Sequence, residues 1–196
     1  TRVLWIANPN NPTGTFLPYA DVHAFLSSVP AEVVVVLDEA YTEYLLPSER
    51  VDSVRWLSEF PNLVITRTFS KIYGLAGLRV GYAVAQTAIA DLMNRVRQPF
   101  NVSNLGLAGA KAALADHVFI ATSYEMNRQG MQQIVAGLKR LGLEHIPSHG
   151  NFVTFAVNDA KASNAHLLKQ GVIVRPLGGY EMPHHLRVTI GREAEN

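Results

Sequence analysis

The sequence predicts an α/β fold with a mostly parallel sheet, followed by a small α+β unit at the C-terminal end. Up to about residue 100, short apolar runs alternate with helical stretches, as in strands joined by crossover helices. One run, Val33–Leu37, is apolar at every position, which is typical of a parallel strand covered on both faces. A longer helical stretch then leads into a second group of strands after residue 150.

The elements of the first part follow from local patterns. Residues 22–29 place apolar side chains at helical spacing, with Pro18 expected in the first turn and Pro30 at the end. The expected strands are Val3–Ala7, Val33–Leu37, Leu63–Thr68 and Val80–Ala85, and the further expected helices are Val54–Phe60 and Ala88–Arg95.

The second part begins with the longest helix, over about residues 118–141. At about 1.5 Å per residue, such a helix is long enough to leave one domain and enter another. Lys139 and Arg140 suit its C-terminal dipole, and Gly142 suits a left-handed cap. The other expected elements are helices at Leu105–Ala115 and Ala160–Gln170 and strands at Phe152–Val157, Val172–Arg175 and Leu186–Ile190.

The ends of the chain affect the expected domain division. The chain opens on Thr1 directly before a strand, and Gly191–Asn196 reads as a turn without the helix it should lead into. We therefore expect residues 1–120 to be the C-terminal portion of a large domain. Residues 121–196 are expected to be a small C-terminal domain that is incomplete at its end.

Composition excludes several classes of protein. The formal net charge is +1, which argues against a strongly basic protein that wraps nucleic acid or binds membranes through a polybasic segment. Apolar residues make up 48% of the chain and charged residues 17%, so a buried core is expected. The absence of cysteine excludes a disulfide framework and a thiolate metal site within these residues. No apolar run approaches the ~20 residues that span a bilayer, and a soluble, cytoplasmic protein without nucleic-acid or membrane partners is expected.

Three polar segments follow the expected strands at their carboxyl ends, where open parallel sheets bind ligands. They are residues 8–14, residues 38–41 and residues 68–79. Each segment also has a purely structural explanation. The first can be a turn, the second can contain a capping aspartate, and the third can contain a solvated lysine in a glycine-containing loop. Their occurrence together and in this order favours a shared site. The seven histidines lack the spacing of a metal site, so no metal is expected.

These segments resemble the pyridoxal-phosphate-dependent aminotransferases of fold type I, the class I and II or aspartate-aminotransferase-like group. Within that group the sequence is most similar to the histidinol-phosphate aminotransferases, and the likeness corresponds to the C-terminal part of a protein about twice as long. The stretches that carry the resemblance are 68–79, 98–103, 150–152, 174–176 and 186–191.

The resemblance assigns a role to each cofactor residue. Lys71 would form the Schiff base with pyridoxal 5′-phosphate and move a proton after the substrate displaces it. Asp38 would keep the pyridine nitrogen protonated, so that the ring can accept electrons. Asn11 and Tyr41 would hydrogen-bond the ring hydroxyl. The phosphate would be held by Thr68, Ser70 and Arg79.

The substrate residues implied by the resemblance lie in the second part. Alternation in Leu186–Ile190 turns Arg187 away from the apolar face, and the resemblance assigns it to a carboxylate or phosphate of the substrate. Arg175 would be a second anion contact, with a surface arginine as the alternative. Asn151 would line the pocket, with a simple turn residue as the alternative.

The resemblance implies an enzyme of histidine biosynthesis that is active as a homodimer. It would exchange an amino group between glutamate or 2-oxoglutarate and histidinol phosphate or imidazole acetol phosphate. Two alternatives stay open: another enzyme of the same fold, such as an aromatic amino-acid aminotransferase or a phospho-amino-acid decarboxylase, and a non-catalytic sensor. The family's glycine-rich phosphate loop and ring-stacking aromatic lie upstream of residue 8, so these 196 residues alone are expected to be inactive.

Overall fold

The computed structural model describes residues 1–196, which form two compact units. The first unit comprises residues 1–8 and 17–121, and the second comprises residues 9–16 and 122–196. The loop of residues 9–16 therefore leaves the first unit and belongs to the second. The division of the full protein into domains at residue 120 stays a prediction.

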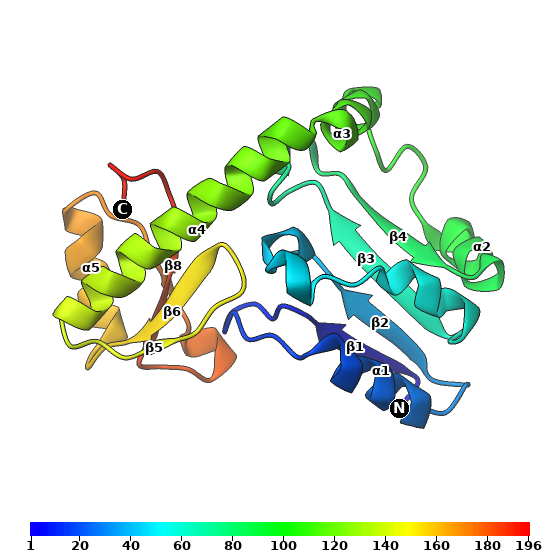
Figure 1. Cartoon of the computed structure of the whole chain (residues 1–196), viewed down its shortest axis with the longest axis horizontal. Coiled ribbons are helices and arrows are strands. Elements are labelled where there is room, and N and C mark those ends of the chain that lie inside the picture. Colours follow the sequence, from blue (N-terminus) through cyan, green and yellow to red (C-terminus); the bar gives the residue numbers. More distant parts are fainter. The chain divides into compact units, whose positions relative to one another are not determined.

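The first unit is built on a four-stranded sheet, whose strands run side by side in chain order (Figure 1). The sheet is mixed and mostly parallel, because β4 alone runs antiparallel to its neighbour. Between β3 and β4 the chain forms only a 3₁₀ turn, η4 (Ala76–Leu78), instead of the crossover helix that parallel strands need. The strands are β1 (Val3–Ala7), β2 (Val34–Asp38), β3 (Leu63–Thr68) and β4 (Gly81–Ala85).

The helices of the first unit follow the predicted order, with two differences. Pro18 is the residue before α1 and has an extended ψ of 136°, so it lies outside the first turn where it was expected. The expected helix at Val54–Phe60 is a 3₁₀ helix, η3 (Ser53–Ser58), whose Trp56 ring packs edge-on against Tyr19 of α1. The remaining elements are α1 (Tyr19–Ser28), η1 (Thr42–Tyr44), η2 (Pro47–Glu49), α2 (Thr87–Val96) and α3 (Asn104–Ala115).

The second unit contains an antiparallel sheet in the order β5-β6-β8-β7. The prediction of a strand at Val172–Arg175 is wrong for its first residues, because Val172 caps α5 by donating its N–H to the carbonyl of Leu167. The short strand β5 was not predicted. The elements are α4 (His117–Arg140), β5 (His145–Ile146), β6 (Phe152–Ala156), α5 (Ala160–Lys169), β7 (Arg175–Pro176), η5 (Gly178–Tyr180) and β8 (His185–Thr189).

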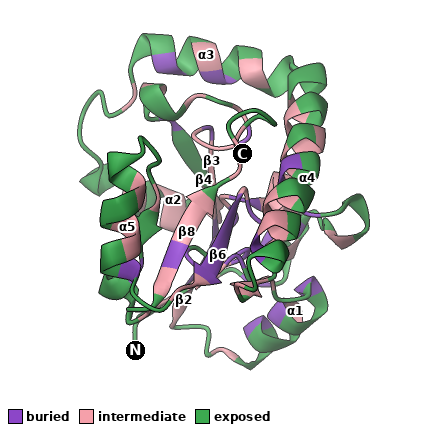
Figure 2. Cartoon of the chain, turned by 90° about the vertical axis from the view of Figure 1, so that its left-hand side faces the viewer, coloured by how far each residue is buried: buried purple, intermediate pink, exposed green.

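The two faces of this second sheet differ in chemistry. Val153, Phe155 and Leu186 join Leu138 of α4 and Ala160 of α5 in one apolar cluster, so both helices cover the same face. The central strand β6 is buried along most of its length (Figure 2). The alternating residues of β6 and β8 point to the other face and are more polar, as predicted for Leu186–Ile190.

A helix that crosses a bilayer must be about 20 residues long and predominantly apolar. No single helix is both long and apolar enough to do so. Only α3 and α4 taken together, as a bent pair, meet the criteria of length and composition.

Candidate functional site

An open cleft of about 430 Å³ lies in the first unit, at the carboxyl ends of β2 and β3. This is the edge at which parallel sheets bind ligands. Seven of the residues that line it bear polar or charged side chains: Asp38, Thr66, Arg67, Thr68, Ser70, Lys71 and Arg79. The structure thus brings five of the predicted cofactor residues to one place.

One end of this cleft is suited to an anion. The Ser70 N–H donates to the hydroxyl of Thr68 at 3.0 Å, so both hydroxyls belong to one tight turn. Arg79 has a left-handed backbone conformation, and its Nη1 lies 3.5 Å from Ser70 Oγ and donates to the Ala76 carbonyl at 2.8 Å. A guanidinium and two hydroxyls in this arrangement supply the donors that a phosphate group prefers.

Lys71 is held by its neighbours in the sequence. Phe69 and Ile72 are buried, and the Phe69 N–H donates to the carbonyl of Val80, which anchors the segment to the unit. Lys71 itself is half-buried, and its Nζ lies 5.2 Å from the centre of the Tyr41 ring. Tyr41 is itself a predicted site residue and is buried. At this distance its ring and the lysine form a cation–π contact.

Asp38 is the last residue of β2 and lies opposite Thr66 in the parallel ladder. One of its carboxylate oxygens accepts the N–H of Ala40 at 3.1 Å, which closes the turn that follows the strand. The half-buried side chain also lines the cleft that contains Lys71. Asp38 therefore closes a local turn and also contributes a carboxylate to the site.

The other predicted residues lie in the second unit. Arg187 donates to the side-chain oxygen of Asn11, and Thr154 donates to the carbonyl of Pro12. These contacts hold the loop of residues 9–16 on the polar face of β6 and β8. The Arg187 guanidinium also lies 5.0 Å from the centre of the Phe152 ring.

The arginine on β8 retains donor capacity. Arg187 Nε is buried and has no hydrogen-bond partner, so one donor of the guanidinium is unused. Arg175 of β7 is the direct cross-strand partner of Arg187, which places two positive charges side by side on one face. Like charges directly opposite each other repel, and a bound anion would relieve that repulsion.

Asn151 is half-buried and precedes β6, where its carbonyl accepts the N–H of Ile190 at 2.9 Å. This contact describes the backbone of Asn151 and leaves the predicted pocket role of its side chain untested. The structure places Asn151 in the second unit with the two arginines.

Two residues with evident structural roles were missed by sequence reasoning. Asn8 is fully buried, and its side chain bonds both the N–H and the carbonyl of Leu17, at 2.8 and 2.9 Å. Glu39 is a fully buried carboxylate directly after Asp38. The available signal for Glu39 was its place as a charged residue directly after β2. The hydrogen-bond partners of Glu39, however, lie far away in the sequence.

The chain is similar to known proteins over its full length. The family model for aminotransferase class I and II matches residues 1–196. Histidinol-phosphate aminotransferase 1 of Dechloromonas aromatica is 71% identical over the whole chain, and histidinol-phosphate aminotransferase 2 of Nitrosospira multiformis is 62% identical. The chain spans 54% and 50% of these two relatives, or about half the length of each.

A solved structure has the same fold. The histidinol-phosphate aminotransferase of Sinorhizobium meliloti, in complex with pyridoxal-5′-phosphate, matches 99% of this chain with a TM-score of 0.92 and 33% sequence identity. The matched residues make up 54% of that chain. This likeness confirms the predicted α/β architecture.

Proposed function

Because the chain belongs to the class I and II aminotransferases, with the aspartate-aminotransferase-like fold, we propose that the full protein is a histidinol-phosphate transaminase. It exchanges an amino group between glutamate or 2-oxoglutarate and histidinol phosphate or imidazole acetol phosphate, in histidine biosynthesis. Similarity to histidinol-phosphate aminotransferases supports this assignment. The observation that carries it is the cleft that gathers Asp38, Lys71 and Arg79.

Pyridoxal 5′-phosphate fits the residues of this cleft. Arg79 and the hydroxyls of Thr68 and Ser70 would hold its phosphate, and the Asp38 carboxylate would hold a proton on its ring nitrogen. Lys71 would bind it covalently through Nζ. When bound, the cofactor supplies an electron-accepting ring that stabilises negative charge on the reacting carbon of the amino acid.

Lys71 has a second task once the substrate has displaced it. Its free Nζ would move a proton from the reacting carbon of the substrate, which requires an uncharged amine. The buried Tyr41 ring limits where that amine can lie. Tyr41 and Asn11 would donate to the hydroxyl oxygen of the cofactor ring.

The second unit would recognise the anionic ends of the substrates. Arg187 and its cross-strand partner Arg175 form a pair of cations that can bind either a phosphate or a carboxylate. Glutamate carries two carboxylates and histidinol phosphate one phosphate, so the same pair could serve both half-reactions. Asn151 would contribute to this pocket.

We further propose that the full protein is a cytoplasmic homodimer. Several apolar side chains around α2 and α3 are strongly exposed, including Val96 at 83% and Phe100 at 97%, which supports an interface that covers them. The assembly can be measured by light scattering of the purified full protein. A monomer with cofactor bound would contradict this proposal and leave the assigned reaction intact.

The central test labels the lysine. The full protein is incubated with pyridoxal 5′-phosphate, reduced with borohydride and mapped by peptide analysis. A label on Lys71 alone is expected, with Lys111→Ala, an exposed position on α3, as the control that leaves the label unchanged. Diffuse labelling of surface lysines would contradict the cofactor assignment.

A substrate panel then separates the candidate reactions. Histidinol phosphate is expected to be the best amino donor to 2-oxoglutarate, ahead of phenylalanine and aspartate. Release of carbon dioxide from threonine phosphate would instead indicate a decarboxylase. If Lys71→Ala kept full biological activity, the protein would be a sensor that needs no proton transfer.

A further inference from the structure

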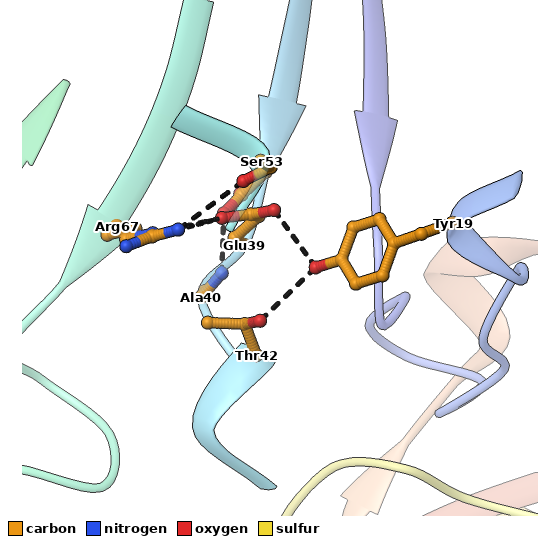
Figure 3. Close-up of polar contacts among 7 residues, drawn as sticks. Tyr19, Glu39, Ala40, Thr42, Ser53 and Arg67 are labelled. Atoms are coloured by element: carbon orange, nitrogen blue, oxygen red, sulfur yellow. Dashed lines mark hydrogen bonds and ion pairs between the residues drawn. The ribbon is translucent and has the colours of Figure 1, made fainter. Parts of the chain in front are cut away.

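A polar network adjoins the cofactor cleft through Arg67, which lines it. Its centre is Glu39, which is fully buried although it carries a carboxylate. Arg67 of β3 donates to one oxygen of this carboxylate through both Nε and Nη2, at 2.9 and 2.8 Å. Tyr19 of α1 donates to the other oxygen at 2.9 Å, and the two partners approach Glu39 from opposite sides (Figure 3).

Further contacts fix the two partners of Glu39. The Tyr19 hydroxyl lies 3.2 Å from Thr42 Oγ1, and Arg67 Nη2 lies 3.4 Å from Ser53 Oγ. Burial, reinforced by the Glu39 charge, raises the pKa of Tyr19, so its hydroxyl remains a donor at neutral pH. Burial acts to lower the pKa of Arg67, but Glu39 raises it overall, and the guanidinium stays charged.

The position of this network in the chain suggests its role. Glu39 directly follows Asp38, and Arg67 directly precedes Thr68 in the segment that leads to Lys71. The ladder between β2 and β3 ends at the pair Asp38 and Thr66, and the Glu39 N–H makes one more bond, to the carbonyl of Thr66. Beyond that point the ion pair of Glu39 and Arg67 joins the two chain segments, in addition to the contact between Tyr41 and Lys71.

We propose that Glu39 and Arg67, supported by Tyr19, are positioning residues for the cofactor cleft, an inference that rests on the function proposed above. The network fixes the Asp38 carboxylate relative to the segment that carries Thr68, Ser70 and Lys71. These groups would bind opposite ends of one rigid ring, so their separation determines whether all of them can engage it. A displacement of about 1 Å in such a site can reduce a rate about 100-fold.

Stability alone is a weak explanation for this pair. Desolvation of two charges offsets much of their attraction, and apolar replacement of a whole buried ion pair is often neutral or stabilising. Removing one partner is costly, because it leaves the other charge buried without compensation. A double replacement therefore separates positioning from folding.

The deciding variant is Glu39→Leu/Arg67→Met in the full protein, with unaltered protein shown first to bind pyridoxal 5′-phosphate at Lys71. We expect cooperative urea unfolding to be retained, while the dissociation constant for pyridoxal 5′-phosphate rises about 10-fold or more. The pH midpoint of the bound cofactor's visible absorbance should move in the same direction as in Asp38→Asn. Arg67→Lys, which keeps the charge but loses the planar fork of donors, should show a smaller change of the same sign.

Leu26→Ala serves as the matched control, because it removes a buried side chain of α1 that makes none of these hydrogen bonds. It should lower stability and leave the absorbance midpoint and cofactor affinity unchanged. The proposal is overturned if the folded double variant retains the affinity and midpoint of the unaltered protein, or if Leu26→Ala reproduces its losses.

If the double variant does not fold, Tyr19→Phe decides in its place by the same two readouts. A lower cofactor affinity with a shifted midpoint supports positioning, and unchanged values overturn it. Failure of unaltered protein to be labelled at Lys71 would instead contradict the proposed function itself.

Discussion

Replacing Gly14 with alanine tests the geometry of the loop of residues 9–16. Gly14 is buried and has a φ of +77°, in the left-handed region that disfavours a side chain. Its carbonyl accepts the N–H of His149 at 2.8 Å, which draws the backbone close to the segment before β6. A Cβ at this position would lie 2.2 Å from Ser148 Oγ and 2.6 Å from Ser148 Cβ.

Two separate costs can be estimated from this geometry. The left-handed conformation costs about 1–2 kcal/mol for a residue with a Cβ. Overpacking against Ser148 adds about 1–3 kcal/mol, because its Cβ is fixed to the backbone and cannot rotate away. Together they predict a loss of about 2–5 kcal/mol in the free energy of unfolding for Gly14→Ala.

A double-mutant cycle separates the two costs. Ser148→Gly removes the two closest atoms and leaves Ser148 Cα at 3.0 Å, so in that background the loss for Gly14→Ala should fall toward the conformational cost of about 1–2 kcal/mol. The free energies come from urea midpoints of the full protein at unchanged m-value. A loss below about 1 kcal/mol for Gly14→Ala, or a cycle without coupling, would refute the close approach of the two segments.

Three further predictions concern packing, hydrogen bonding and charge. Leu186→Ala, which empties a fully buried position in the apolar cluster of the second unit, should lower the free energy of unfolding by about 2–5 kcal/mol in urea titrations. Thr154→Val keeps the shape but deprives the loop of residues 9–16 of a buried donor, so the same assay should show a loss of about 1–3 kcal/mol. Hydrogen bonds from Arg128 lower the pKa of the exposed Glu125 to about 2, so their stabilisation is present above the ordinary pKa and is lost as the pH falls toward 2. Arg128→Gln should return this pKa toward 4.5 in a carboxyl NMR titration, and an unchanged value would contradict the pairing.

Local patterns predicted most of the elements because they depend on nearby residues. The strand Leu63–Thr68 has the predicted bounds, and Gly142 has the positive φ expected after a long helix. Val172 was misassigned because its apolar character fits a strand, whereas its N–H completes the end of α5. Periodicity contains no information about that capping bond.

The residues of the candidate site that belong to short sequence motifs could be predicted. Asp38 and Lys71 stand out because Asp38 ends a strand and Lys71 follows one, each within a distinctive segment, and both line the cleft. Glu39 did not stand out, because its partners are 20 and 28 residues away and belong to different elements. Its importance follows from burial and hydrogen bonds, which are properties of the folded chain.

The path of the loop of residues 9–16 has a consequence for recombination among related genes. Asn8 bonds both backbone groups of Leu17, which closes the base of the loop on the first unit, while the loop itself is held by Thr154 and Arg187 of the second. An exchange of residues 122–196 alone would join one parent's sheet to the other parent's loop. Chimeras that exchange residues 9–16 together with 122–196 keep each loop with its own sheet, and the inherited module is therefore discontinuous in the gene.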